Sequence, residues 1–285
     1  MRNNEERFGA NPLLQDASPV QQIIQQQMQP QGTPLEFMVP TEFVDLPSKG
    51  KFYPAGHPLR GKDTVEVKQM TAKEEDLLTS KTLLKKGVVL DRLIQALVTD
   101  KTIDTDSLTI EDRNAIIISA RIAAYGPEYA TSVTCPSCTQ KSKYAFNLLE
   151  KVPKEPEEEV LHQIHEDGTF TVVLPKTKWT VVCRALSGRD EKTIMSMTEA
   201  KKKSQNDSMF LDQLKLMVVS IQGVTARSTV DVALSSLPAV DSRFLRTQYQ
   251  KIVVPFDMKQ NFSCSQCEFE TILEVPLTAD FFWPK

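Results

Sequence analysis

Four of the five cysteines in this 285-residue chain form two Cys-x-x-Cys pairs that lie far apart in the sequence. Cys135 and Cys138 make the first pair, and Cys264 and Cys267 make the second. One pair supplies two thiolates, whereas a structural zinc ion is held tetrahedrally by four ligands. The two pairs together predict one structural zinc ion per chain, bound by all four cysteines in a zinc-ribbon-like site. Such a site has no open coordination position for catalysis.

The cysteine pairs have three alternative roles besides a shared zinc site. A redox-active pair usually lies at the start of a helix near a βαβ pattern, but both pairs lie in segments whose alternating hydrophobicity predicts β-hairpins. The pairs could also be vestigial, or they could bind metal only between two chains. The fifth cysteine, Cys183, falls in a predicted strand, and we expect it in the core.

The segments that must position these cysteines occur twice along the chain, which indicates an ancient tandem duplication. Both copies contain a helix start with the Ser/Thr and acidic spacing of a capping box, followed by a Leu-Asp segment and a Ser-Leu segment. The matching segments are 71–74 with 187–190, 90–98 with 211–219, and 107–114 with 236–243. They occur in the same order in both copies, and each series ends at a cysteine pair.

Each repeat predicts a short strand, three helices and a β-hairpin around its cysteine pair. The clearest helix covers 110–125, because its apolar residues recur at helical spacing and Gly126-Pro127 follows as a stop signal. We therefore predict an α+β fold with a first repeat at 41–150 and a second repeat at 170–285. The shared zinc site would join the two repeats.

Two segments outside the repeats have a different composition. Residues 1–40 include seven glutamines between Gln21 and Gln31, and this composition predicts a disordered tail. Folding of residues 19–28 on a partner is the alternative. Residues 151–169 begin with prolines and glutamates and predict an acidic linker.

Composition argues against several classes of function. The formal net charge is −3 at pH 7, so no general basic field is available to hold nucleic acid, and no nucleic-acid partner is expected. No apolar run approaches the roughly 18 residues of a membrane span, and we expect the chain to stay in a reducing cytoplasm. The sequence has no glycine-rich phosphate loop, no HExxH motif and no GxSxG motif. These features together predict that the protein is not an enzyme.

Long segments of the first repeat resemble a known family. They are LPSKGKFYPAGHPLRG, EVKQMTAKEEDLLTSKTLLKKG, DRLIQALVTDK and DRNAIIISARIAAYGPEYATSVTCPSC. These segments, between about 42 and 149, resemble the baseplate hub subunit family of T-even-like contractile-tailed bacteriophages, and the resemblance is looser in the second repeat. It implies a structural or assembly role in the central hub of the tail baseplate. The implied partners are other hub proteins and the tape-measure protein, met in the host cytoplasm during tail assembly or in the virion baseplate.

One segment, 44–54, is the candidate partner-binding surface. Leu46, Pro47, Phe52 and Tyr53 are the residues that a rigid exposed loop would use to dock an apolar anchor of a partner. The alternative is a well-packed lead-in that covers the first strand.

Two further functions are alternatives to a hub component. One is a tail assembly chaperone for the tape-measure protein or another hub component, which would be absent from finished particles. The other is a zinc-ribbon protein that binds nucleic acid or acts in transcription. That function would rely on a basic patch, to which Lys141, Lys143 and Lys259 are the obvious contributors.

Overall fold

The computed structural model describes residues 39–80, 82–83, 88–150, 164–202, 209–256, 258–275 and 279–282. The predicted tail lies outside the described residues except for residues 39 and 40, and so does the predicted linker as far as residue 163. Within these ranges, none of the helices combines the length and the apolar character that a membrane crossing requires.

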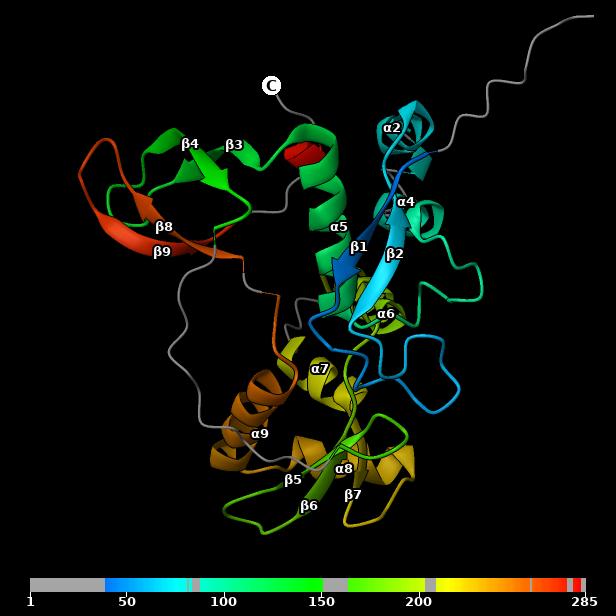
Figure 1. The fold of residues 1–285 in the computed structure, drawn as a ribbon. Coiled ribbons are helices and arrows are strands. Elements are labelled where there is room, and N and C mark those ends of the chain that lie inside the picture. Colours follow the sequence, from blue (N-terminus) through cyan, green and yellow to red (C-terminus); the bar gives the residue numbers. More distant parts are fainter. Residues whose placement is uncertain are drawn as a thin grey trace, which may run out of the picture. The chain divides into compact units, whose positions relative to one another are not determined.

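The described chain consists of small antiparallel sheets and separate helices, so the predicted α+β class is confirmed (Figure 1). The strands are β1 (Thr41–Asp45), β2 (Thr64–Lys68), β3 (Glu128–Thr134), β4 (Lys141–Asn147), β5 (Phe170–Val173), β6 (Thr180–Cys183), β7 (Val218–Ile221), β8 (Lys259–Ser263) and β9 (Glu270–Glu274). The helices are α2 (Ala72–Thr79), α4 (Val89–Leu97), α5 (Ile110–Tyr125), α6 (Gly188–Lys202), α7 (Met209–Met217), α8 (Arg227–Ser235), α9 (Ala239–Ile252) and the short 3₁₀ helix η1 (Ala279–Phe282).

The first half of the chain, described between residues 39 and 150, starts with the two-stranded sheet β1–β2, in which Val44 pairs with Val65. Side chains of directly paired residues on neighbouring strands project from the same face of a sheet, and both of these valines are buried. Helix α5 packs against β1, and α2 packs against α4. Helix α5 ends where the sequence predicts, at Gly126, whose φ of 79° is a conformation that glycine adopts without strain.

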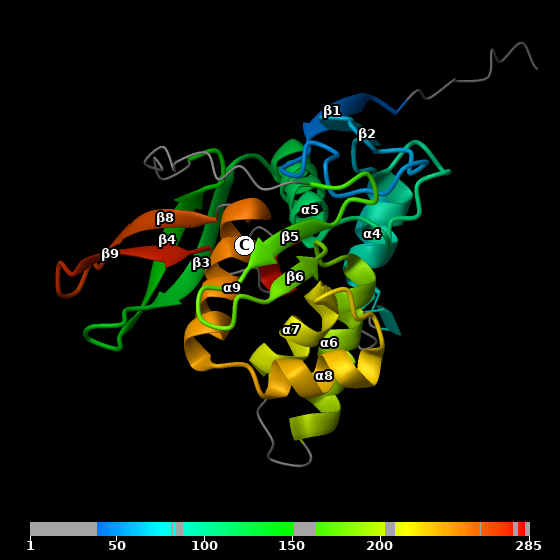
Figure 2. The ribbon, with the colours of Figure 1, turned by 90° about the horizontal axis from the view of Figure 1, so that it is seen from below.

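The second half contains the three-stranded sheet β5–β6–β7, with α8 packed against β7 (Figure 2). The prediction of three helices was wrong here, because the described residues of this half form four, α6 to α9. The additional helix is α8, which is rich in β-branched residues but buries Val230 and Leu234. Packing of such residues in a core overrides a weak local helix preference.

The repeated segment 211–219 is helical over only part of its length. The helical conformation stops at Met217, and β7 starts at Val218 and pairs with β6. Two adjacent β-branched residues favour a strand at this point. In the first half, Val98 follows α4 in the same way and forms a single antiparallel bridge to Val67.

The predicted capping box is present at α2, and α6 starts with the corresponding contact from its capping serine to the acid three residues later. At the start of α2, the backbone N–H and the hydroxyl of Thr71 donate to Glu74 Oε2 at 3.0 and 2.5 Å. At the start of α6, the same two groups of Ser187 donate to Asp190 Oδ2, both at 2.8 Å. These bonds satisfy donors that helix geometry leaves unpaired.

Each capping acid also forms an ion pair with a basic residue six positions earlier in the chain. Lys68 Nζ lies 2.8 Å from Glu74 Oε1 in the first half. In the second half, the guanidinium of Arg184 donates to both oxygens of Asp190 at 2.7 Å. Each pair therefore joins the end of a strand to the first turn of the next helix.

A buried aspartate in the first turn of a helix holds the preceding hairpin in each half. Asp112 of α5 accepts hydrogen bonds from Ser48 N at 3.0 Å, from Ser48 Oγ at 2.6 Å and from the Tyr53 hydroxyl at 2.6 Å. Asp241 of α9 accepts from the backbone N–H groups of Lys176 and Thr177 at 2.8 and 2.9 Å. In both halves, the segment that links the first two strands is tied to a helix start.

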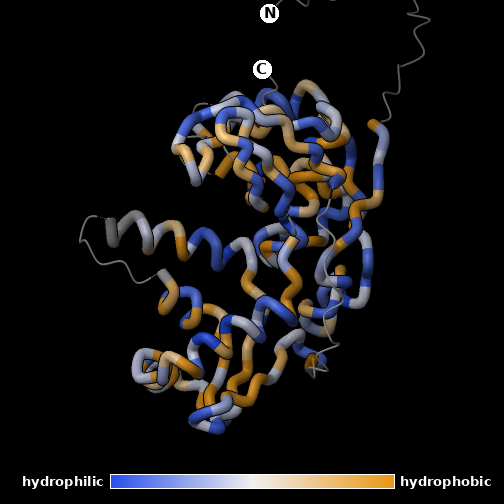
Figure 3. Tube along the Cα trace, turned by 90° about the vertical axis from the view of Figure 1, so that its left-hand side faces the viewer, coloured by the Kyte–Doolittle hydropathy of each residue, from blue (hydrophilic) through white to orange (hydrophobic). Residues whose placement is uncertain are grey.

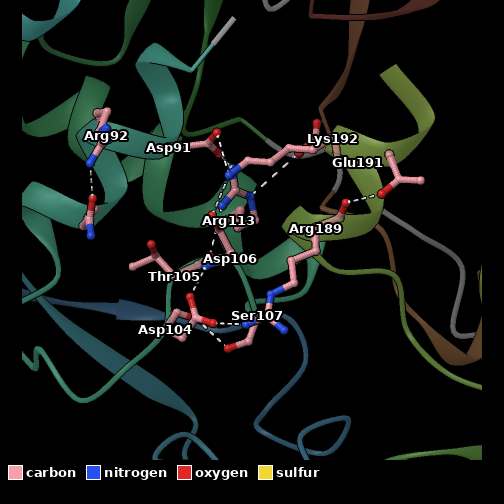
Figure 4. Close-up of polar contacts among 12 residues, drawn as sticks. Asp91, Arg92, Asp104, Thr105, Asp106, Ser107, Arg113, Arg189, Glu191 and Lys192 are labelled. Atoms are coloured by element: carbon pink, nitrogen blue, oxygen red, sulfur yellow. Dashed lines mark hydrogen bonds and ion pairs between the residues drawn. The ribbon is translucent and has the colours of Figure 1, made fainter. Parts of the chain in front are cut away.

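A cluster of polar contacts connects the first half with the start of α6 (Figure 4). Arg113 is buried, donates to the carbonyl of Thr105 at 3.0 Å and pairs with Asp91. Lys192 of α6 bridges Asp91 at 3.0 Å and Asp106 at 2.8 Å. The carboxylate of Asp91, shared by Arg113 and Lys192, links α4, α5 and α6.

The buried residues form two hydrophobic clusters. The first contains residues between 44 and 148 together with residues between 258 and 282, and the second contains residues between 170 and 253. Apolar segments, orange in Figure 3, gather in the region of sheet β5–β6–β7. The second cysteine hairpin therefore packs with the first half of the chain and not with the helices that precede it.

Candidate metal centre

The two cysteine pairs lie in two β-hairpin turns of nearly identical geometry. In the β3–β4 turn, Cys135 N donates to the carbonyl of Gln140, and Thr139 N donates to the carbonyl of Cys135, both at 2.9 Å. In the β8–β9 turn, Cys264 N donates to the carbonyl of Phe269, and Glu268 N donates to the carbonyl of Cys264, both at 3.0 Å. Residues 139 and 268 both have positive φ, at 60° and 56°. This conformation turns the chain sharply behind each cysteine pair.

The fold brings all four predicted cysteines together. Their Sγ atoms lie within 4.8 Å of one another. The distances from Cys135 to Cys267 and from Cys138 to Cys264 are both 3.8 Å. A tetrahedral zinc ion with Zn–S bonds of about 2.3 Å holds its sulfurs about 3.8 Å apart, whereas a disulfide needs about 2.05 Å. The arrangement therefore suits a tetrahedral metal ion.

The local environment acts in opposite directions on the two thiols of the second pair. A hydrogen bond from the Phe269 N–H favours the Cys267 thiolate, but desolvation and the neighbouring cysteine thiols outweigh it and raise the pKa of Cys267 to about 12. The backbone N–H of Gln266 donates to Cys264 Sγ at 3.4 Å, and this bond lowers the pKa of the Cys264 thiol to about 7. Cys135 and Cys264 are buried, Cys138 is half-buried and Cys267 is exposed. A metal ion would thus be enclosed on one side and accessible to solvent at Cys267.

Contacts beside the cysteines hold the two hairpins together. The ring centroids of Tyr144 and Phe262 are 5.0 Å apart, and the Tyr144 hydroxyl donates to the carbonyl of Asn261 at 2.9 Å. The side-chain amide of Gln260 donates to the carbonyl of Asn147 at 2.6 Å and accepts from Asn147 N at 3.2 Å. These aromatic and hydrogen-bond contacts therefore also hold the β3–β4 and β8–β9 hairpins against each other beside the cysteine cluster.

Arg121 connects this pair of hairpins to α5 and to η1. It is 1% exposed, and its guanidinium donates to the carbonyls of Phe281 at 2.8 Å, Gly126 at 2.9 Å and Glu128 at 3.2 Å. It also lies 5.1 Å from the centroid of the Tyr125 ring. The carbonyls and the negative end of α5 stabilise its charge.

We expect Arg121→Ala to lower the free energy of unfolding by about 2–4 kcal/mol, because three carbonyls lose a charged donor and a packed stem is removed. Urea unfolding followed by circular dichroism measures this change. Arg92→Ala is the control, since the side chain of the exposed Arg92 donates only to Gln95 among the described residues, and we expect a change within about 0.5 kcal/mol. Equal effects of the two substitutions would contradict the anchoring role of Arg121.

The prediction of an exposed docking loop at residues 44–54 needs correction. Leu46 and Tyr53 are only 3% and 2% exposed, so they belong to the core of this chain. Pro47 is half-buried, and Phe52 is half-buried with its ring centroid 6.1 Å from that of Phe170. Tyr53 is held inside by its hydrogen bond to Asp112. The segment is therefore a packed lead-in to the first sheet, which was the alternative interpretation of its sequence.

The remaining cysteine is buried in β6, as predicted, and burial raises the pKa of the Cys183 thiol to about 12. Three residues with structural roles, Asp112, Arg121 and Gln260, were not predicted from the sequence. Asp112 lies in a helical first turn, where acids are favoured. Nothing near Arg121 or Gln260 in the sequence indicates their distant partners.

A comparison with protein families gives a match that covers all the described residues. The family is described as T4 bacteriophage base plate protein, and its model matches residues 38–283. The chain belongs to this family. Comparisons with curated proteins and with solved structures gave no match.

Membership of the T4 base plate protein family confirms the resemblance found in the sequence at the level of the phage baseplate. It indicates a structural role in the phage, association with other baseplate or tail proteins, and a place in the virion tail. The match extends through both halves of the chain and includes both cysteine pairs.

Proposed function

We propose that the protein is a non-enzymatic component of the central hub of the phage tail baseplate, and that it uses one zinc ion structurally. The observation that carries this proposal is the cluster of four cysteine sulfurs, two from each half of a baseplate-family chain. Four thiolates complete a tetrahedral zinc site and leave no position for a substrate or for water. In this proposal the metal holds the protein together and performs no reaction.

The zinc ion would join two repeats that arose by duplication. Support for a duplication comes from contacts that recur at matching positions. These are the two hydrogen bonds from a capping Thr or Ser N–H to the acid three residues later, the two ion pairs at the helix starts, and the two aspartates that hold the hairpins. Duplication of a unit with one cysteine pair supplies the second half of the ligand set.

The charges around the cysteine hairpins give little support to nucleic-acid binding. The exposed charged residues of the hairpins include Lys141, Lys143, Lys259, Glu268, Glu270 and Glu274. Lys259 and Glu274 are cross-strand partners on β8 and β9. Because acids offset the basic residues here, the hairpins lack the one-sided positive charge that phosphate binding requires.

The position of the protein in the particle tests the proposed hub role. A phage that encodes an epitope-tagged chain would be grown, and its tails and isolated baseplates would be purified and analysed by quantitative mass spectrometry and cryo-electron microscopy. We expect a fixed number of copies per baseplate and tag density at the central axis. Tag density confined to the baseplate periphery would contradict the hub role.

The same preparation distinguishes a hub component from an assembly chaperone. A chaperone for the tape-measure protein or for another hub component would appear in infected-cell extracts and be absent from purified tails. Cross-linking of the tagged chain in such extracts would then identify the protein that it holds.

A further inference from the structure

A cavity of about 470 Å³ lies between α7 and α9, away from the cysteine cluster. Its walls include Leu186, Leu214, Met217 and Tyr249, and Glu111 from the first turn of α5 also lines it. The volume is within the range of cavities that hold small ligands or large side chains. Most of this lining is apolar, and Glu111 is the acidic residue among it.

One oxygen of the Glu111 carboxyl group has no partner within the described part of the chain. This atom, Oε2, is buried and accepts no hydrogen bond from any residue that the structure describes. Burial raises the pKa of Glu111 to about 7, and the nearby charges of Asp112 and Glu191 act in the same direction. Buried carboxylates are normally paired or hydrogen-bonded, so this group is suited to a cation that enters the cavity.

The two ends of the cavity differ in charge. Glu111 follows Ile110, whose N–H donates to the carbonyl of Leu186 at 3.0 Å, and the N–H of Leu186 donates to the Tyr249 hydroxyl at 2.9 Å. These bonds place Glu111 beside the C-terminal part of α9, where the helix dipole also favours a positive charge.

The basic residues of the cavity lie toward the other end of α9. Arg243 lines the cavity and is exposed, and the guanidinium of Arg246 lies 5.0 Å from the centroid of the Phe210 ring at the start of α7. Arg246 is therefore close to an aromatic ring, but its buried Nε atom has no hydrogen-bond partner among the described residues, and no ion pair joins it to Glu111 there. The Glu111 end of the cavity is left with an unmatched acidic group.

We propose that this cavity receives a lysine or arginine side chain of a partner polypeptide, with the cationic group against Glu111. Leu186, Leu214 and Met217 offer apolar contacts to the aliphatic stem of such a side chain. The partnerless oxygen of Glu111 favours a cationic occupant over a purely apolar one, and an acidic side chain directed at Arg246 is the competing occupant that the binding test must separate. The proposal depends neither on the zinc ion nor on the hub role.

Binding of n-butylammonium, which has the chemistry of a lysine side chain, tests the proposal. The full-length protein would be titrated at pH 7.5 with n-butylammonium, n-butanol or butyrate, and binding would be followed by two-dimensional NMR. We expect n-butylammonium to bind at least tenfold more tightly than either other probe, with the largest shifts at Leu186 and Tyr249. Tighter binding of butyrate, equal binding of butanol, or no saturable shift with any probe would each overturn the proposal.

Matched variants locate the binding site. Glu111→Gln should weaken n-butylammonium binding at least fivefold, whereas Glu270→Gln, at an exposed position on β9, should leave it unchanged. Gln213→Trp, which places a large side chain at a half-buried position of the lining, should also block binding. Unchanged binding in the Glu111 and Gln213 variants would contradict the assignment of this cavity.

Discussion

Cys264→Ser is expected to prevent binding of the proposed zinc ion and to destabilise the β3–β4 and β8–β9 hairpins together. Because a structural metal binds the folded site and not the unfolded chain, its binding energy contributes directly to folding. Loss of one thiolate from a four-thiolate site should lower the melting temperature by on the order of 10 °C. Native mass spectrometry reads the zinc content per chain, and hydrogen exchange reads the protection of each hairpin.

Cys183→Ser is the matched control for the chemical change. Cys183 is buried in β6 and lies outside the cysteine cluster, so this variant should lose some core stability and keep one zinc ion per chain. A Cys264→Ser protein that keeps its zinc, or in which only the β8–β9 hairpin loses protection, would show that the two halves do not share the metal. Zinc present only in a dimer of the unmodified chain would indicate a site between two molecules.

Asp112→Ala should strongly destabilise the first half of the chain. The change removes the acceptor of three hydrogen bonds and leaves Ser48 N, Ser48 Oγ and the Tyr53 hydroxyl buried without that partner. Burial and the charge of Asp112 raise the pKa of Tyr53 far above its usual range, so Tyr53 stays protonated and remains a donor. We expect the free energy of unfolding to fall by about 3–5 kcal/mol, as measured by urea denaturation.

Asp104→Ala is the comparison for this prediction. Asp104 is exposed and pairs with the exposed Arg189, so its removal should change stability by less than about 1 kcal/mol. If Asp112→Ala and Asp104→Ala were similarly mild, the bonds from residues 48 and 53 would not be important for holding the segment between β1 and β2.

The parts of the fold that were predicted correctly depend on local patterns. Helix α5 could be predicted because its apolar spacing and its glycine stop lie within one segment. The two hairpins could be predicted because alternation and cysteine spacing occur side by side. The convergence of the four cysteines followed from coordination chemistry, because a single pair cannot complete a zinc site.

The parts that were missed depend on contacts between distant residues. Segment 44–54 contains prolines and glycine that suit an exposed loop, but Tyr53 is buried through Asp112, 59 residues further along. Arg121 could equally have been a surface residue of α5, and its partner Phe281 lies 160 residues away. Neither partner can be recognised from the neighbouring sequence, so both required the three-dimensional structure.

The order of the cysteines along the chain has a consequence for synthesis on the ribosome. Cys135 and its partner across the cluster, Cys267, are separated by 132 residues. The first pair therefore emerges as an incomplete ligand set, while the helices of the second half are still being translated. Closure of the cluster can occur only after the β8–β9 hairpin has emerged, so a chain truncated before that hairpin cannot form the shared site. Binding of the proposed zinc ion would thus distinguish chains that have passed this point of translation from those that have not.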